Sequence, residues 1–462
     1  MNPTSELIAP EVQELIEGRH YAQFRESIEG MEPADIADVF RLIPADLAAI
    51  GFRLLPHDEA ADVLSYFDAE FMETLVAALG TQQACRILDE MSTDDLAGFL
   101  EEVPAPVAQG IVASLKPENR QAIQAILGYP EESVGRIMTS DYVRVRAHWS
   151  VAQALEHIRR YGRDAETVNV VYVVDEKGKL VADIRLRAML LADPESVIQD
   201  IIEPITTALR ATDDQESAVR MMARYDRIAL PVVDSHGVLV GIVTADDVAD
   251  IAEEEVTEDI QQLAGVEALD EPYMATGFVE MLRKRAGVLA ILLVAQSVTI
   301  GVLGFFEGHL SAAKILILFI PLIIASGGNT GTQTASLLIR AIALNELGPD
   351  AWKRVLLKEL ATGAALGVFL WLLAWIAVLL WNLTPLAQTS SPLLAGATVG
   401  ISVLGIVLWA VSLGSMLPLI LQRLKLDPTT ISSPLVATLM DVSGLTIYLT
   451  VAIIMLTAFG DF

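Results

Sequence analysis

The chain has 462 residues, enough for several domains, and combines a composition that is 53% hydrophobic with a formal net charge of −29. Residues 1–280 carry 53 acidic and 21 basic side chains, a balance of −32, whereas residues 281–462 carry 7 and 10, a balance of +3. An acidic surface disfavours a nucleic-acid partner and attracts cations, and the single Cys85 excludes a disulfide framework and a cysteine-rich metal site.

A period of 12 residues runs through about the first 115 residues. Apolar pairs recur at the fourth and fifth places, as in Val39-Phe40 and Ile87-Leu88, and another apolar residue recurs at the eighth. Pro and Gly punctuate the units, so we expect a superhelix of short helices over residues 1–130, with Cys85 as a small buried residue. The first residues are acidic and lack a basic-then-apolar start, so we expect no signal peptide.

From about residue 134, a pattern of strands and helices occurs twice. The first copy has strands near 143–145, 170–175 and 180–184 with a helix at 151–161. The second has a helix at 215–225 and strands at 228–234 and 239–244. Gly178 and Gly237 mark the turns of the two hairpins. Together the copies resemble a tandem CBS module, an α/β domain over residues 131–252 of a kind that binds adenine nucleotides or senses ions.

Acidic side chains concentrate where this module ends. Asp247, Asp250, Glu254 and Glu258 are spaced three or four residues apart, which places them on one face if the helix is continuous. Like charges at this spacing repel one another. The row is either an ordinary solvated face or a set of carboxylates that share divalent cations with other domains. We expect a connecting (plug) helix over residues 253–280.

Residues 281–462 contain five apolar stretches long enough to cross a bilayer as helices. They cover about 286–306, 315–342, 355–381, 393–421 and 431–459. Basic residues gather on one side, beginning with Arg283, Lys284 and Arg285. The positive-inside rule therefore places the N-terminus in the cytoplasm and the C-terminus outside. We expect a multi-pass, all-α membrane domain that contacts lipid in the cell (inner) membrane.

Asp441 is the one acid near the middle of a predicted span, about 15 Å deep at helical rise. An ionisable side chain there costs several kcal/mol unless it meets a partner or water. The sequence offers no basic residue at a matching depth. Asp441 is thus either a structural hydrogen-bonding aspartate or part of an aqueous path. The small polar run 326–334 in the second span fits either tight helix packing or such a path.

The residue types near Asp441 indicate which ion would pass. One carboxylate with hydroxyls and amides, without His or Cys, suits Mg²⁺, Ca²⁺ or Mn²⁺ rather than zinc or copper. Mg²⁺ keeps several of its waters when it binds one or two carboxylates. Two chains on a two-fold axis would bring two copies of Asp441 to one pore, which suggests a homodimer.

The chain resembles the MgtE family of Mg²⁺ channels over essentially its whole length. The motifs that carry the resemblance are 256–260, Gly327-Gly328-Asn329-Thr330-Gly331, 337–341, and Asp427-Pro428 with the run 433–444. The resemblance implies a superhelical N domain, a tandem CBS domain and a pore domain of five helices at 281–462. It also implies a homodimer with its pore on the two-fold axis.

The resemblance further implies three groups of functional residues. In the pore, Asp441 would hold the ion beside the Ala437 carbonyl, and Asn329, Thr332 and Ser433 would line the path. The acids between the connecting helix and the membrane half would be Glu255, Glu258, Asp259 and Asp427. The sensor acids of the CBS region would be Glu216, Asp226, Asp247 and Asp250, with Glu59 and Asp94 in the superhelix.

Four residues depart from the family pattern. Thr332 and Ser433 stand where the family often has Asn, and their shorter side chains leave strict Mg²⁺ selectivity open. Ala188 follows Arg187 where ATP-binding members have an acid for the ribose, and Arg227 replaces an aromatic flank. We therefore expect that this chain does not bind ATP.

We expect a Mg²⁺-selective channel for magnesium uptake, which closes when cytoplasmic Mg²⁺ bridges the acid clusters. Mg²⁺ is then both the transported ion and the regulatory ligand. The alternative is a transporter of Co²⁺ or Mn²⁺, or a cation-coupled exchanger, of the same architecture. A CBS-regulated membrane enzyme and a non-conducting receptor or scaffold are further classes. The membrane half offers no nucleophile–base pair or metal triad, so we expect no enzyme.

Overall fold

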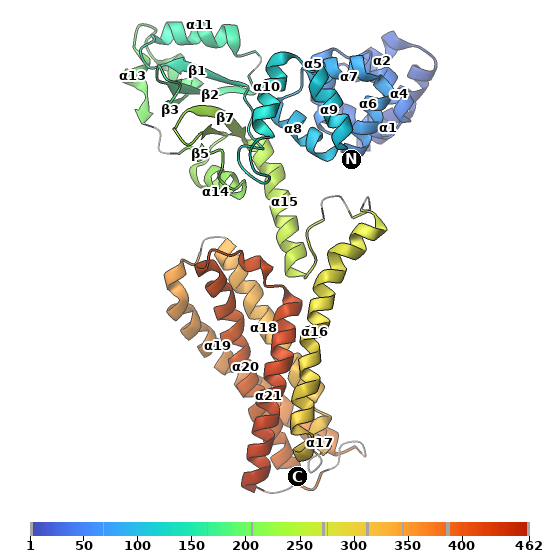
Figure 1. Ribbon diagram of the computed structural model, residues 1–462, viewed down its shortest axis with the longest axis vertical. Helices are drawn as coiled ribbons and strands as arrows, with labels where there is room; N and C mark the ends of the chain where they lie inside the picture. Colours follow the sequence, from blue (N-terminus) through green and yellow to red (C-terminus); the bar gives the residue numbers. More distant parts are fainter. Residues whose placement is uncertain are drawn as a thin grey trace. The chain divides into compact units, whose positions relative to one another are not determined.

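The computed structural model describes residues 3–67, 69–163, 165–204, 207–269, 273–274, 276–310, 314–343, 346–384 and 389–459. The chain forms two compact units, Met1–Glu253 and Glu254–Phe462. The first unit contains a helical part and an α/β part, and the second is helical (Figure 1). This multidomain architecture confirms the fold class predicted from the sequence.

The described part of the first unit begins with ten helices. These are α1 (Pro3–Glu17), α2 (Tyr21–Ile28), α3 (Pro33–Arg41), α4 (Ala45–Phe52), α5 (His57–Ser65), α6 (Ala69–Leu79), α7 (Thr81–Leu88), α8 (Thr93–Glu102), α9 (Ala105–Ser114) and α10 (Pro117–Ile126). From α3 onward, each helix begins 12 residues after the previous one. The repeat predicted from the apolar pattern is therefore confirmed as a stack of short helices.

The apolar positions of the repeat form one continuous core. Every eighth-place residue is buried, from Ile43 through Leu55 to Leu115, and so is Cys85. Proline starts several of the helices, as at Pro33 and Pro117, because a first-turn residue needs no amide hydrogen for the helix ladder. Short helices that cannot each bury a face alone gain a shared core by stacking.

The second part of this unit contains two small sheets. Its elements are β1 (Tyr142–Arg146), α11 (Val151–Tyr161), β2 (Thr167–Val174), β3 (Leu180–Arg185), α12 (Leu186–Leu191), α13 (Ile198–Ile201), β4 (Glu203–Pro204), β5 (Leu209–Arg210), α14 (Glu216–Tyr225), β6 (Ala229–Val233) and β7 (Leu239–Thr244). The sheet orders are β1-β2-β3-β4 and β5-β6-β7. In both sheets a parallel pair is followed by an antiparallel hairpin, so the predicted duplication is confirmed.

The two hairpin turns of this module bind each other directly. The amide of Leu180 donates to the Gly237 carbonyl and the amide of Leu239 donates to the Gly178 carbonyl, each at 3.1 Å. Both glycines have positive φ, at 80° and 79°, a conformation that glycine adopts at little cost. The reciprocal bonds join the two CBS copies through equivalent turns.

Helix α15 (Ala245–Leu263) continues directly from β7 for 19 residues. It is continuous through the acidic row, which therefore occupies one helix. The segment predicted as a connecting helix over 253–280 is helical only to Leu263. Gly265, with φ at +78°, follows the end of the helix and turns the chain, and the next helix begins at Phe278.

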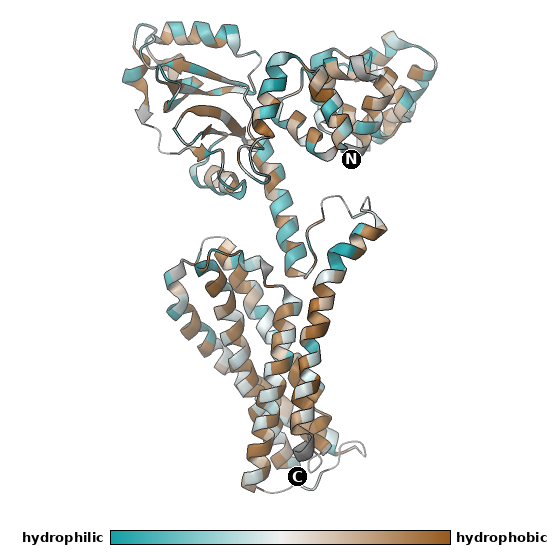
Figure 2. Cartoon of the chain, viewed as in Figure 1, coloured by the Kyte–Doolittle hydropathy of each residue, from teal (hydrophilic) through white to brown (hydrophobic). Residues whose placement is uncertain are grey.

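The second unit is built from long apolar helices. These are α16 (Phe278–Leu310), α17 (Lys314–Ile317), α18 (Ile320–Ala343), α19 (Trp352–Asn382), α20 (Pro392–Arg423) and α21 (Ser433–Phe459), with short 3₁₀ turns η1 (Pro349–Ala351) and η2 (Pro428–Thr430). In the described residues, five candidate spans of 27 to 32 residues are long and apolar enough to cross a membrane. Hydrophobic residues run along them (Figure 2). The predicted stretches at 286–306, 355–381 and 393–421 fall within α16, α19 and α20. The stretch at 315–342 crosses the break between α17 and α18, and the stretch at 431–459 begins two residues before α21.

Candidate ion-binding sites

A cavity of about 310 Å³ lies between α18 and α21. Its lining residues are Ile324, Ala325, Gly328, Asn329, Thr332, Gln333, Ala437 and Asp441. Carboxylate, amide, hydroxyl and carbonyl oxygens are the donors that hard divalent cations prefer. The cavity therefore combines a few side chains that carry such oxygens, those of Asn329, Thr332, Gln333 and Asp441, with an otherwise apolar lining.

Helix periodicity explains why these residues meet. Asn329 and Thr332 lie three residues apart on α18, and Ala437 and Asp441 lie four apart on α21, so each pair shares a helix face. The two helices pack closely here, since a Cβ built on Gly331 would lie 3.1 Å from Cγ1 of Val436 and 3.2 Å from Cγ of Met440. The structure thus brings together four of the five residues that the sequence assigned to the pore.

Ser433 is the fifth, and it does not line this cavity. It is the first residue of α21, eight residues before Asp441, so it lies about 12 Å away along the helix axis. The sequence motif placed both residues on one helix but could not fix how far the cavity extends.

Gln296 of α16 contacts the carboxylate of Asp441 and was not identified from the sequence. Its Nε2 donates a hydrogen bond of 2.9 Å to Oδ2 of Asp441. Among the described residues, Asp441 has no second protein donor. Gln296, which does not line the cavity, therefore holds Oδ2 of Asp441, whose side chain does line it. A useful signal was available, because Gln296 is the one amide in the first predicted span and a polar side chain there requires a partner.

Replacing Gln296 by Leu should weaken ion binding at Asp441. A hydrogen bond to a charged group contributes about 1.5–3 kcal/mol, and its loss leaves the carboxylate free to turn out of the cavity. We expect the external Mg²⁺ concentration for half-maximal flux to rise roughly tenfold in proteoliposomes. Thr299→Val is the matched control, because the buried Thr299 hydroxyl has no hydrogen-bond partner among the residues that the structure describes. Equal or tighter Mg²⁺ dependence in Gln296→Leu would contradict this role.

A second group of acids lies where the helical repeat meets the CBS part of the first unit. Asp94 of α8 interacts with Asp247 of α15 and with Glu166, which precedes β2. Thr244 donates to Asp247 at 2.5 Å, whereas Oδ1 of Asp94 is buried and meets no hydrogen-bond partner in the part of the chain that the structure describes. The sequence assigned Asp94 and Asp247 as sensor acids from separate regions, and the structure brings them together. Glu166 was missed, because nothing local distinguishes it from other exposed acids.

Burial and the closeness of the other carboxylates raise the pKa values of the acids in this group. Burial raises the pKa of Asp94 well above its usual range, and the charges of Asp247 and Asp95 add to the effect. Burial also raises the pKa of Asp247 to about 6 and that of Glu166, which keeps an exposed edge, to about 7. Among the described residues, no three acids, His or Cys are close enough to hold one ion directly. A hydrated Mg²⁺ would suit such spacing, because it binds through its waters.

Mild acidification without divalent cations should stabilise the first unit. A carboxyl with a raised folded-state pKa binds its proton more tightly when folded, so stability falls as pH rises from about 4 to about 7. We expect the first melting transition of the full chain in EDTA to rise by several degrees between pH 8 and pH 6. Asp247→Asn should flatten this dependence, whereas the exposed Asp200→Asn should not. A melting temperature that falls with acidification would contradict the prediction.

A third group connects α15 with the turn before α21, within the second unit. Gln262 donates to Glu258 at 2.5 Å, and Thr429 lies within hydrogen-bond distance of both Gln262 and Asp427. Glu258 and Asp427, both assigned from the sequence, are thereby joined through two neutral side chains. Glu255 and Asp259 lie on the same helix as Glu258.

Of the remaining assigned acids, Asp250 borders the second group, since its charge helps to raise the pKa of Asp95, whereas the other three lie on other elements. Glu59 is in the first turn of α5, and Asp250 is exposed on α15. Glu216 begins α14 and pairs with Arg220 at 2.5 Å. Asp226 follows the end of α14 in a left-handed conformation, so the helix length separates it from Glu216.

Asp226 instead lines a cavity of about 520 Å³ in the CBS module. The lining residues are Asn169, Val170, Arg185, Leu186, Arg187, Leu190, Asp226, Arg227 and Ile228. Arg227 pairs with Asp183 at 2.5 Å, so one nitrogen of its guanidinium is already bound to a carboxylate. The surroundings of Asp226 are therefore rich in arginine, which suits an anion better than a cation.

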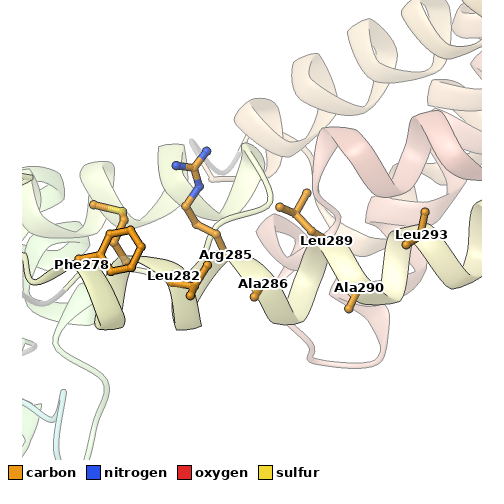
Figure 3. A pocket seen from close by; sticks show the side chains of 8 residues that line it. Phe278, Leu282, Arg285, Ala286, Leu289, Ala290 and Leu293 are labelled. Carbon is orange, nitrogen blue, oxygen red and sulfur yellow. The ribbon is translucent and has the colours of Figure 1, made fainter.

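Another cavity, of about 490 Å³, lies along α16 alone. Its lining residues are Phe278, Met281, Leu282, Arg285, Ala286, Leu289, Ala290 and Leu293. Figure 3 shows these side chains following one another along one helix, with Arg285 as the charged member. An apolar stripe with one cationic group lacks the oxygen donors of an ion site.

Sequence comparison places the domains in a known family. The profile of the MgtE family, described as a divalent cation transporter, matches residues 320–451. The MgtE intracellular N domain matches 31–132, and CBS domains match 134–195 and 198–254. The soluble half is similar to the crystal structure of the cytosolic domain of the Mg²⁺ channel MgtE in complex with ATP, at 36% identity and a TM-score of 0.50, covering 53% of this chain and 99% of that one.

Full-length relatives extend the similarity to the whole chain. The magnesium transporter MgtE of Thermus thermophilus is 39% identical over 457 residues, covering 98% of this chain and 99% of the relative. The magnesium transporter MgtE of Bacillus subtilis is 30% identical over 429 residues, covering 93% of each chain. With its five apolar helices, the chain is a multi-pass membrane protein, and it belongs to the MgtE family.

Proposed function

We propose that this chain takes up Mg²⁺ through a pore at Asp441. The cavity between α18 and α21 carries the proposal, because it joins a lone carboxylate to the oxygen donors of Asn329, Thr332 and Ala437 inside an apolar bundle. The relatives named as magnesium transporters support Mg²⁺ as the ion. Asp441 holds the hydrated ion, and the hydrogen bond from Gln296 orients the Asp441 carboxylate.

The chain works as a homodimer with its pore on the two-fold axis. The cavity is lined by two helices of one chain, so a second copy supplies the opposite wall and a second Asp441. The N-terminal acidic domains are cytoplasmic and the C-terminus is outside, because Arg283, Lys284 and Arg285 flank the first span.

Cytoplasmic Mg²⁺ closes the pore by binding acids that otherwise repel each other. Asp94, Asp247 and Glu166 form the best-supported sensor site, because burial and mutual repulsion raise their pKa values. Mg²⁺ acts by binding the closed state more tightly than the open state. The test is patch-clamp current against cytoplasmic Mg²⁺, and a current that stays flat from micromolar to tens of millimolar would refute the sensor.

Asp94→Asn should reduce the response to cytoplasmic Mg²⁺. The variant removes one ligand and one repelling charge, so it weakens inhibition at high Mg²⁺ and relieves repulsion at low Mg²⁺. We expect the concentration for half-inhibition to rise by roughly tenfold, equivalent to about 1.4 kcal/mol of differential binding. Asp200→Asn serves as the surface control, and an Asp94→Asn response like that of the wild type would exclude Asp94 from the sensor.

We infer that this CBS pair does not bind ATP, although the similar cytosolic domain was solved with ATP and the cavity is rich in arginine. Ala188 is not among the residues that line the arginine-rich cavity and has no carboxylate for the ribose hydroxyls. Arg227 is paired with Asp183. Calorimetric titration of the full chain with ATP tests this, and saturable binding at micromolar ATP would overturn it.

A further inference from the structure

Thr429, in the turn before α21, has a hydroxyl between two acceptors. Its Oγ1 lies 2.5 Å from Oδ2 of Asp427 and 2.9 Å from Oε1 of Gln262 on α15. The side chain is only 5% exposed. Gln262 in turn donates through Nε2 to Glu258 at 2.5 Å. A neutral hydroxyl and a neutral amide therefore connect two carboxylates.

A hydroxyl has one proton, so Thr429 can donate to only one of these two acceptors at a time. An ionised carboxylate is the stronger acceptor. Without a cation the proton therefore goes to Asp427, and Oε1 of Gln262 receives no hydrogen from Thr429. The amide of Thr429 donates to Oδ1 of Asp427 at 2.9 Å in either case, which keeps the turn in place.

We propose that Thr429 and Gln262 are positioning residues that transmit the occupancy of Asp427 to the connecting helix. This inference rests on the proposed gating function. A divalent cation bound to Asp427 withdraws Oδ2 as an acceptor, and the Thr429 proton then turns to Gln262. The new bond ties the end of α15 to the turn before the pore helix.

The turn that ends α15 already packs on the start of α21. A Cβ built on Gly265 would lie 3.2 Å from Cγ of Pro434 and 3.5 Å from Cβ of Ser432. Ala437 and Asp441 follow about one and two turns later on α21. Tightening the Thr429–Gln262 bond therefore acts on the helix that carries the pore carboxylate.

The first experiment compares full-length Thr429→Val, Thr429→Ser and Gln262→Leu in proteoliposomes. Losing one hydrogen bond that forms only in the closed state should raise the Mg²⁺ concentration for half-inhibition by about tenfold in the Val and Leu variants. Thr429→Ser keeps the hydroxyl and should behave like the wild type. The external Mg²⁺ concentration for half-maximal flux should stay unchanged in all three. Thr450→Val and the exposed Gln124→Leu are the matched controls.

The second experiment uses Asp427→Asn. Its amide nitrogen, in the place of Oδ2, donates to Oγ1 of Thr429 and so directs the Thr429 proton to Gln262 without a cation. We expect a flux at least about threefold below that of the wild type in the absence of cytoplasmic Mg²⁺. If Asp427 were only a cation ligand, the same variant would match the wild type without Mg²⁺ and be more open than the wild type at inhibiting Mg²⁺ concentrations, which would overturn the proposal.

Hydrogen exchange of the full chain separates this inference from the gating function. We expect Thr429→Val to increase exchange of the amides of residues 264–266 at least about fivefold in Mg²⁺, with Thr429→Ser unchanged. Protection in Thr429→Val equal to the wild type, or an unchanged half-inhibition concentration, overturns the relay. A wild-type flux that does not respond to cytoplasmic Mg²⁺ refutes the gating function, and the exchange result still decides whether the relay holds α15.

Discussion

Asp441→Ala should strongly reduce Mg²⁺ flux while leaving the protein folded and assembled. The carboxylate is the one charged side chain in the cavity between α18 and α21, and Ala leaves the ion only neutral oxygens. A charged interaction of about 1.5–3 kcal/mol corresponds to roughly 10- to 100-fold in binding, and two chains at one pore would lose two such groups. We therefore expect at least about a tenfold fall in Mg²⁺ uptake into proteoliposomes.

Two variants sharpen this test. Asp441→Asn keeps the shape and the contact with Gln296 but removes the charge, so its flux should fall almost as far. Asp350→Asn, an exposed acid in η1 of the membrane half, should conduct like the wild type. Gel filtration and melting must match the wild type, since a buried structural aspartate would instead be needed for folding. Unchanged flux in Asp441→Ala would reject the pore.

Gly414→Ala should destabilise the membrane half and reduce flux together. A methyl group on Gly414 of α20 would lie 2.6 Å from the carbonyl oxygen of Gly331 and 3.4 Å from the amide nitrogen of Ala335, both on α18. Backbone atoms cannot rotate aside, so the helices must separate, at a cost of about 1–3 kcal/mol. The displaced segment of α18 includes Asn329 and Thr332, so the cavity changes shape. We expect a melting temperature several degrees lower.

Gly405→Ala is the control on the same helix. Its added methyl would lie 3.6 Å from Cγ2 of Ile447, an ordinary contact, and Ala is the better helix former by about 1 kcal/mol. This variant should therefore be neutral or slightly stabilised, with wild-type flux. Equal melting temperatures for Gly414→Ala and the wild type would show that α18 and α20 are not in close contact at this point.

The elements of the fold were predictable where one pattern dominates. The 12-residue period predicted a stack of short helices because apolar positions such as Phe40 and Leu64 repeat with it, and most of these positions are buried. Long apolar runs predicted the five membrane helices, since little else satisfies the backbone in lipid. The end of α15 at Leu263 was missed, because Gly265 turns a chain whose polarity alone suggested a longer helix.

The sites were predictable only in part. Motifs on α18 and α21 placed Asn329, Thr332, Ala437 and Asp441 correctly on one cavity. The sequence does not show contacts between distant segments. Gln296, which binds Asp441, and Glu166, which interacts with Asp247, were therefore missed. Sequence spacing gives the face of a helix but not the helix packed against it.

A structure determined once in Mg²⁺ and once in EDTA tests the role of Asp441 most directly. We predict density for a hydrated ion in the α18–α21 cavity, at a water-mediated distance of about 4–5 Å from the Asp441 carboxylate, in Mg²⁺ only. A dry cavity under both conditions, with Asp441 bonded only to protein groups such as Gln296, would contradict ion conduction at this site.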